Sequence, residues 1–194
     1  MSLATCTKIS GDILINCDYP SVGGTEDVLY LINKEDIDSY TVNTENPLII
    51  ESISIKTGKE AYKFEGKRSS VVPGFEFADE ESVSGFIHNV NFKVFTVDPT
   101  VKEQLAGLRD ARLVAITKNN YRGADGKGAF ELYGKELGLL TSEMTRNLNE
   151  NNGVVDVILS TEDGYMEPNP PHSVYDTSLS TTEAHIESLL TVAS

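Results

Sequence analysis

VSGFIHNVNFKVFTV, residues 83–97, is the stretch that decides the fold. It is the longest run dominated by β-branched and aromatic residues without an internal proline, so it predicts one strand of roughly 50 Å, at about 3.3 Å per residue. Side chains alternate between the two faces of a strand, and apolar residues fall on both faces here. One face carries Phe86, Val90, Phe92 and Val94, and the other carries Val83, Ile87, Phe95 and Val97. Both faces therefore need a cover, either from the same domain or, on part of the strand, from a second subunit.

The composition is typical of a globular protein with an unusually acidic surface. The chain has 194 residues, enough for one domain with a real core, and 39% of them are hydrophobic and 24% charged. There are 16 Lys and Arg against 30 Asp and Glu, which leaves a formal charge of −14. Such a surface repels phosphate, which argues against binding to nucleic acid or to an anionic membrane. It suits a protein past which a nucleic acid slides without sticking.

The sequence predicts a soluble protein that is made in a cytoplasm. No stretch approaches the roughly 20 apolar residues of a membrane helix, and the start, MSLATCTKIS, lacks the apolar segment of a signal peptide. Cys6 and Cys17 have neither metal-ligand spacing nor a neighbouring histidine. A disulfide between them and two reduced thiols are both open.

The chain divides into three predicted parts. Residues 1–24 form an N-terminal arm with one short apolar run, and residues 25–160 form the body. Residues 161–194 contain the extended linker EPNPPH, residues 167–172, and end in a short helix that the capping box STTE, residues 180–183, opens. This helix must dock on its own body or on a neighbour, because a lone helix of this length is marginal in water. Its apolar stripe consists of Ile186, Leu189, Leu190 and Ala193.

The body is predicted to be mainly β, a mostly antiparallel β-sandwich or barrel with one packed helix in addition to the C-terminal helix. A helix is expected over residues 98–109, with Asp98 as its N-cap, and its apolar face is expected to lie flat on the sheet. The segments 48–55 and 60–66 are separated by a turn and are expected to form an antiparallel hairpin. The other predicted strands are 28–32, 113–116, 129–133, 137–144 and 154–159.

KRSSVVPGFEFADEES, residues 67–82, separates two predicted strands and is longer than most loops in a compact domain. Its apolar residues have no evident use within one domain, and its two ends carry opposite charges. We therefore predict a projecting loop, in the form of a hairpin, that docks on another subunit. The predicted inter-subunit contacts in this loop and on the long strand are Val71, Val72, Phe75, Phe77, Phe86 and Phe92.

The sequence contains no catalytic, cofactor-binding or metal-binding motif. The acidic turn at 34–38 lacks the glycine and the later glutamate of an EF-hand loop, and the glycines of 119–128 lack phosphate-loop spacing. The three histidines, His88, His172 and His185, lie in different settings, and His88 is expected to be packed on the long strand. We predict no enzyme activity, no cofactor and no metal.

The order of these elements resembles the tail tube (major tail) proteins of long-tailed bacteriophages. The stretches KFEGKRSSVVPGFEF and SGFIHNVNFKVF are similar to the strand, loop and strand of such virion proteins. The resemblance covers residues 26–159, with 67–82 in the place of the loop that reaches the next ring and 98–109 in the place of the flanking helix. The C-terminal linker and helix are an addition that the simplest members of the family lack.

This resemblance implies a virion structural protein that assembles with itself into stacked rings in the tail. Its further partners would be other tail and connector proteins, and DNA would pass through the bore without specific binding. Carboxylates lining that bore would repel the phosphates of the passing DNA, which gives the formal charge of −14 a use beyond solubility.

Two other classes of protein remain open from the sequence. A tail terminator, a head decoration protein or a baseplate component has a similar body, but closes one ring or binds a preformed surface without polymerising. The other class is a monomeric β-sandwich module that binds carbohydrate. The chain contains no tryptophan, which argues against this module because it would need exposed aromatic platforms.

Overall fold

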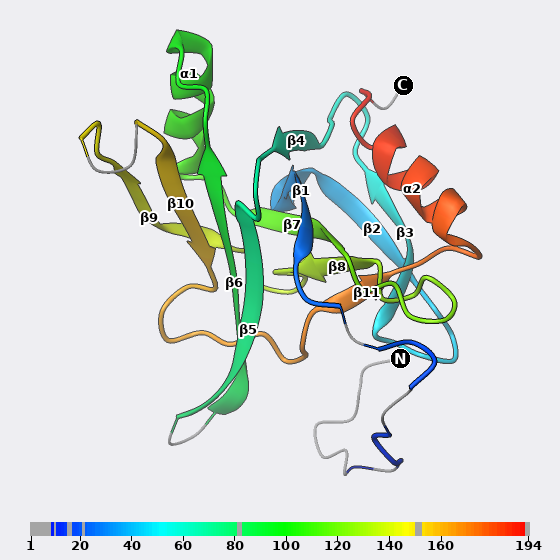
Figure 1. Ribbon diagram of the computed structural model, residues 1–194. Coiled ribbons are helices and arrows are strands. Elements are labelled where there is room, and N and C mark those ends of the chain that lie inside the picture. Colours follow the sequence, from blue (N-terminus) through cyan, green and yellow to red (C-terminus); the bar gives the residue numbers. More distant parts are fainter. Residues whose placement is uncertain are drawn as a thin grey trace.

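The computed structural model describes residues 9, 11–14, 17–20, 22–80, 83–149 and 153–192, which form two β-sheets and two α-helices (Figure 1). The helices are α1 (Pro99–Leu108) and α2 (Leu179–Ser188), and Lys34–Asp36 is a short 3-10 helix. The strands are β1 (Thr25–Asn33), β2 (Ile37–Val42), β3 (Ile49–Ile55), β4 (Tyr62–Glu65), β5 (Val71–Glu80), β6 (Val83–Val94), β7 (Leu113–Asn119), β8 (Phe130–Tyr133), β9 (Leu140–Arg146), β10 (Val155–Ser160) and β11 (His172–Val174).

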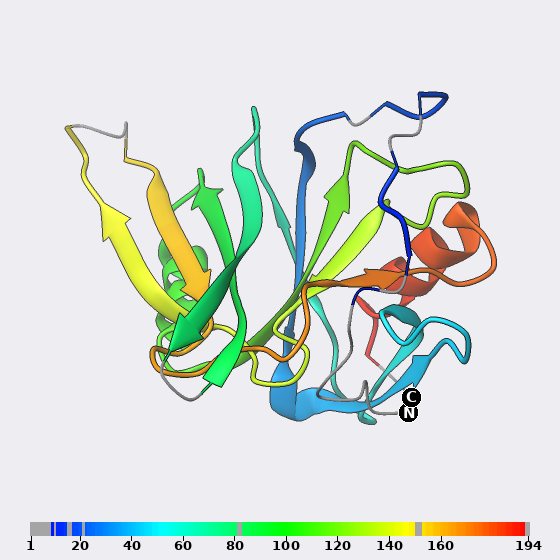
Figure 2. The same ribbon diagram turned by 90° about the horizontal axis from the view of Figure 1, so that it is seen from below.

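The two sheets form a sandwich-like body. Sheet A has seven strands in the order β2-β3-β11-β8-β7-β1-β4, and sheet B has four in the order β5-β6-β10-β9. Neighbouring strands are antiparallel except β11 and β3, which are parallel. Figure 2 shows sheet A between sheet B and α2. The predicted mainly β, mostly antiparallel fold with one packed helix and a C-terminal helix is confirmed.

The central strands of sheet A are buried on both faces, which produces two cores. In β1, Leu29 and Leu31 pack in the core shared with sheet B and α1, whereas Tyr30 and Ile32 pack in the core shared with α2. β7 alternates between the two cores in the same way. Strict alternation of apolar side chains on a strand without a solvent face therefore sets the order of the layers.

The long predicted strand is β6, which ends at Val94 instead of residue 97. The chain then leaves sheet B, and Asp98 caps α1 by accepting a hydrogen bond from the backbone N–H of Val101 at 2.8 Å. Leu105 and Leu108 are buried in the first core, as their helical spacing predicts. The N-cap aspartate followed by proline thus starts this helix where the sequence analysis places it.

The outer face of β6 is less apolar than expected. Asn89, Asn91 and Lys93 alternate with the core residues of the strand, and Phe95 and Val97 follow the end of β6 instead of lying on it. The expectation that both faces of this strand need a cover is wrong for the part of β6 that pairs with β10. Only its inner face lies in a core.

Residues 161–194 are not a linker with a tethered helix. β11 lies between β3 and β8 in the middle of sheet A, so this segment completes the sheet. The prediction is wrong because a strand of three residues beside several prolines carries no readable period, and tertiary pairing specifies it. The N-cap of α2 is Ser178, whose Oγ accepts a hydrogen bond from the N–H of Thr181 at 3.2 Å, so the predicted cap at residue 180 is two residues late.

The C-terminal helix docks on its own body. The hydroxyl of Tyr30 donates to Glu187 at 2.7 Å, the N–H of Ile53 donates to His185 Nε2 at 2.9 Å, and the N–H of Ala61 donates to the carbonyl of Leu189 at 2.7 Å. In the predicted stripe, Ile186 and Leu189 are buried and Leu190 packs against the second core. Ala193 lies outside the described residues.

The predicted hairpin of 48–55 with 60–66 is also wrong. β3 pairs with β2 and β11, whereas β4 pairs with β1 at the opposite edge of sheet A. β2 was not predicted, because its polar residues follow directly on the acidic turn. α2 contacts β3 through His185 and the residue before β4 through Leu189, so sheet A curves around this helix.

The predicted projecting loop at 67–82 is mostly a strand. β5 pairs with β6 from Val71 to Glu80, and only the four residues 67–70 before it form a connection of the kind expected. Pro73 and Gly74 indicate a turn in the sequence, but both lie within β5. Proline lacks a backbone N–H to donate to a neighbouring strand. It is compatible with this position because β5 is an edge strand, which has a neighbour on one side only.

Replacing Ile186 by alanine tests whether α2 is part of the core. This side chain is 1% exposed. Its truncation is expected to lower the free energy of unfolding by about 2–5 kcal/mol, because the cavity forms in a packed layer. Ser188→Ala, on the exposed side of the same helix, is the matched control and is expected to change stability by less than about 0.5 kcal/mol. Urea denaturation of both variants measures the difference, and equal values would contradict the docked helix.

Candidate assembly surface

Sheet B ends in two strands, β5 and β9, whose outer edges pair with no strand in the described part of the chain. β5 has ten residues and β9 has seven. Each outer edge presents a row of backbone N–H and C=O groups that can pair with another strand. Beyond Pro73 the edge of β5 holds no further proline. The carbonyl of Val71 at the start of β5 accepts a hydrogen bond from Thr25 Oγ1 at 2.6 Å, so β5 is open to extension beyond Val71, and β9 is the second open edge.

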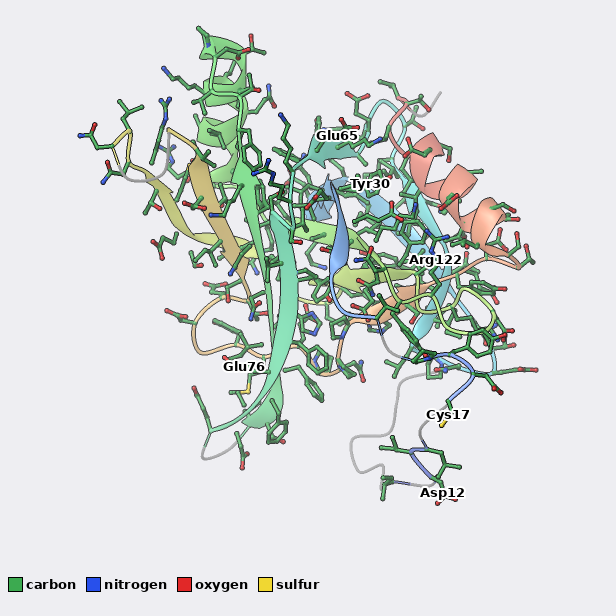
Figure 3. All side chains as sticks on the ribbon, in the orientation of Figure 1. Asp12, Cys17, Tyr30, Glu65, Glu76 and Arg122 are labelled. Atoms are coloured by element: carbon green, nitrogen blue, oxygen red, sulfur yellow. The ribbon has the colours of Figure 1, made fainter. Side chains whose placement is uncertain are left out.

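The β5–β6 hairpin is longer than the core that it covers. Directly opposed residues form its inner face: Val71 with Phe92, Pro73 with Val90, Phe75 with His88, and Phe77 with Phe86. Exposure rises along this face, from 4% at Val71 to 52% at Phe75 and 65% at Phe77. Figure 3 marks this half of the hairpin by Glu76, at the end of the molecule away from α1. The hairpin thus has a core half and an exposed half.

Four of the six predicted inter-subunit contact residues are accessible in the described chain. Val72, Phe75 and Phe77 are exposed and Phe86 is half-buried. Val71 and Phe92 are not accessible, because they pack in the first core beneath β1 and β7. Neither can serve as the predicted contact in this fold.

Phe75, Phe77 and Phe86 form an aromatic group at the exposed end, which we call the tip cluster. The ring of Phe86 lies 5.9 Å from that of Phe75 and 6.0 Å from that of Phe77, both in edge-to-face geometry. Two backbone hydrogen bonds of 2.8 Å join Phe86 to Glu167 and hold this part of β6 against the chain segment before β11. An exposed aromatic group on a strand fixed in this way is typical of an interaction site.

The outer face of sheet B is acidic. Strand alternation places Glu76 and Glu80 of β5, Glu143 of β9 and Asp156 of β10 on this face, against the single basic residue Lys93. Lys93 Nζ lies 2.9 Å from Asp156, so it neutralises one of the four carboxylates. Side chains alternate between two faces within residues 71–80, which places Glu76 opposite to the aromatic residues. The sequence contains this pattern, but it was not used because a loop was predicted at 67–82.

His88 and His185 are hydrogen-bonded within the fold, whereas Nδ1 of His172 is buried without a hydrogen-bond partner among the described residues. His88 Nδ1 accepts a hydrogen bond from the N–H of Gly134 at 3.1 Å, and its Nε2 lies 3.0 Å from the carbonyl oxygen of Asn169, so the neutral ring uses both nitrogens. Burial lowers the pKa of His88 to about 4. Burial, followed by the nearby Lys135 charge, also lowers the pKa of His172 to about 4. His88 is therefore packed on the long strand, as the sequence predicts.

The described residues contain no group of three or more His, Cys, Asp and Glu side chains that could hold a metal ion. In the predicted N-terminal arm, Cys17 is an exposed free thiol, and Ile13 and Leu14 are also exposed. Cys6 lies outside the described residues. The surfaces that stand out are thus the open edges, the tip cluster and the acidic face.

No protein-family model, curated protein or solved structure matches the chain. Neither helix in the part of the chain that the structure describes is long and apolar enough to cross a membrane. Function is therefore inferred from the edges, the apolar tip and the charge of the chain itself.

The buried histidines predict loss of stability in mild acid. The pKa of His88 falls from 6.5 in the unfolded chain to about 4 in the fold, so its stabilising effect is complete above pH 6.5 and is lost as the pH falls toward 4. The full loss is on the order of 3 kcal/mol for such a shift. The free energy of unfolding of His88→Gln is expected to fall less steeply between pH 7 and 4 than that of the wild type. Urea denaturation at several pH values measures this difference. The same pH dependence of the free energy of unfolding in both proteins would contradict this role of His88.

Proposed function

We propose that this chain is a structural subunit of a phage tail tube, which closes with its own copies into rings that stack around an acidic bore for DNA. The observation that carries the proposal is that, among the described residues, no strand pairs with the outer edges of β5 and β9 in sheet B. Of the elements that carry the resemblance to tail tube proteins, the long strand β6 and the helix α1 that follows it support the same reading.

Pairing of β5 in one copy with β9 in the next would continue sheet B across the boundary between subunits. This interface joins two different surfaces, so repeated pairing with a constant rotation closes a ring. Backbone hydrogen bonds would supply affinity without any particular side chain, as in other cases of strand addition. The length of β5, ten residues, gives such an interface a long row of partners.

In such a ring, one face of the continuous sheet would line the bore. We assign this role to the outer face of sheet B, because the inner face is buried against sheet A. Glu76, Glu80 and Glu143 would then point toward passing DNA. Like charge keeps phosphates from forming ion pairs with the wall, so the polymer moves without being held.

The first test is assembly of the purified chain in moderate salt, which screens self-repulsion. Negative-stain electron microscopy is expected to show rings or stacked rings with a central hole. In the assembled fraction, hydrogen exchange of backbone amides in β5 and β9 is expected to slow at least tenfold relative to the monomer, because both edges become paired. β2, an edge strand of sheet A, is the control and is expected to keep its monomer rate.

Two outcomes of this test would count against different parts of the proposal. Absence of any assembly over all concentrations and salts tested would contradict a self-assembling subunit. Rings without added protection of β5 and β9 would keep the self-assembly and reject the pairing of these edges.

The second test concerns the charge of the bore. Changing Glu76, Glu80 and Glu143 to lysine is expected to make assembled rings retain double-stranded DNA, with binding that weakens steeply as salt rises. Wild-type rings are expected to retain none. The matched control makes the same change in net charge at exposed carboxylates elsewhere, Glu35, Glu45 and Glu103. Equal DNA retention by both triple variants would contradict the assignment of the bore face.

A further inference from the structure

A groove opens at the end of β6 opposite to the tip cluster. It lies between β4, the last residues of β6 and α1, and its volume is about 760 Å³. One wall is β4, an edge strand of sheet A. Figure 1 shows β4 and α1 at one end of the molecule and the end of β5 at the other. Apolar side chains that line the groove include Leu31, Phe64, Val94, Val101 and Leu108.

Basic side chains gather at this groove. Lys63, Lys67 and Lys93 line it, and a neighbouring hollow of about 460 Å³ is lined by Lys67, Lys93 and Arg68. Glu60 and Glu65 line the groove as well. Lys63 lies 3.3 Å from Glu65 and 3.5 Å from Glu187, and Lys93 lies 2.9 Å from Asp156. Lys67 and Arg68 are exposed, and no ion pair to either occurs among the described residues. The available positive charge beside the groove therefore comes from Lys67 and Arg68.

The tip of the hairpin has the opposite charge. The sequence between Arg68 and Lys93 contains no lysine or arginine. Glu76, Asp79 and Glu80 are exposed at or beside the tip cluster. The tip is therefore aromatic and acidic, whereas the groove is apolar and basic, and the two surfaces are complementary in both respects.

The tip cannot reach the groove of its own chain. Phe86 and Lys93 lie on the same strand, and the seven-residue step between them spans about 23 Å along β6. Contact between these surfaces thus requires a second copy, displaced along the direction of β6.

We propose that the groove between β4 and α1 is the receptor for the tip cluster of a second copy, stacked head to tail along the direction of β6. The inference rests on the proposed function and identifies both sides of the contact between successive rings. Phe75 and Phe77 enter the apolar groove, and Asp79, which lies on the same face of β5, meets Lys67 and Arg68. The interface is heterologous and leaves a free tip at one end and a free groove at the other, so the stack can grow.

Two double variants test this contact. The tip variant carries Phe75→Ser and Phe77→Ser, and the groove variant carries Lys67→Glu and Arg68→Glu. All four side chains are exposed, so both variants are expected to retain the circular dichroism spectrum and melting temperature of the wild type. Each variant alone is expected to form single rings, because the backbone edges of sheet B are unchanged. The protein concentration needed for these rings to stack is expected to rise at least tenfold.

Mixing the two variants distinguishes head-to-tail contact from contact between two tips. The tip variant keeps an intact groove and the groove variant keeps intact tips, so the mixture is expected to form stacks of two rings and none longer. Electron microscopy and sedimentation velocity measure the stack length. The control variant Lys102→Glu with Lys127→Glu makes the same change in net charge outside the groove and is expected to stack like the wild type.

A cross-link locates the contact directly. In a Cys6→Ser, Cys17→Ser background, Phe77→Cys and Gln104→Cys, the latter in the groove wall on α1, are expected to form disulfides between copies and to give a ladder on a non-reducing gel. Ser188→Cys in place of Gln104→Cys is the control and is expected to give no ladder. Full-length tubes from the groove variant, or equal ladders from both cysteine pairs, would overturn the groove assignment while self-assembly stands. Absence of rings from the wild type would overturn both.

Discussion

The rest of the structure depends on two adjacent strands, β1 and β7, that have no solvent face. Each strand carries apolar side chains on both sides, and each side must be removed from water, which is worth about 25 cal/mol per Å² of apolar surface. Sheet B and α1 cover one side, and α2 covers the other. The C-terminal segment is therefore a structural layer, and sheet A curves around it because strands near both of its edges contact the same helix.

Sheet B covers only part of one face of sheet A, and this incomplete overlap creates the surfaces of interest. β5 and β6 begin over the core and continue past it, so the same row of inward-facing side chains is buried at Val71 and exposed at Phe77. The exposed aromatic residues lie on paired strands and not on a loose loop. A contact made by such a hairpin needs little ordering of the chain, which favours binding because less conformational entropy is lost.

The two ends of β6 carry different surfaces, so the chain has a direction along this strand. An acidic, aromatic tip lies at one end of this strand, and an apolar groove with Lys67 and Arg68 beside it lies at the other. The outer edges of sheet B, which no strand of the described chain pairs with, run along this direction. β5 takes part in both proposed contacts, through the backbone of its outer edge in the ring and through the side chains of Phe75 and Phe77 in the stack, so side-chain substitutions can disrupt stacking while the backbone edge is kept. Both proposed contacts join unlike surfaces, and such contacts produce rings or open stacks according to whether the rotation closes.

The sequence by itself determined the local elements: the apolar strand at 28–32 within β1, the alternating strand at 83–94, and α1 with its Asp98 cap, because each is encoded by periodicity or capping within a few residues. It also indicated exposed apolar contacts at Val72, Phe75 and Phe77. Only the tertiary structure decided that β4 pairs with β1 and not with β3, that three residues beside a proline-rich segment complete sheet A, and that Val71 and Phe92 are buried. These outcomes depend on which distant segment lies alongside, and no local pattern of side chains carries that information.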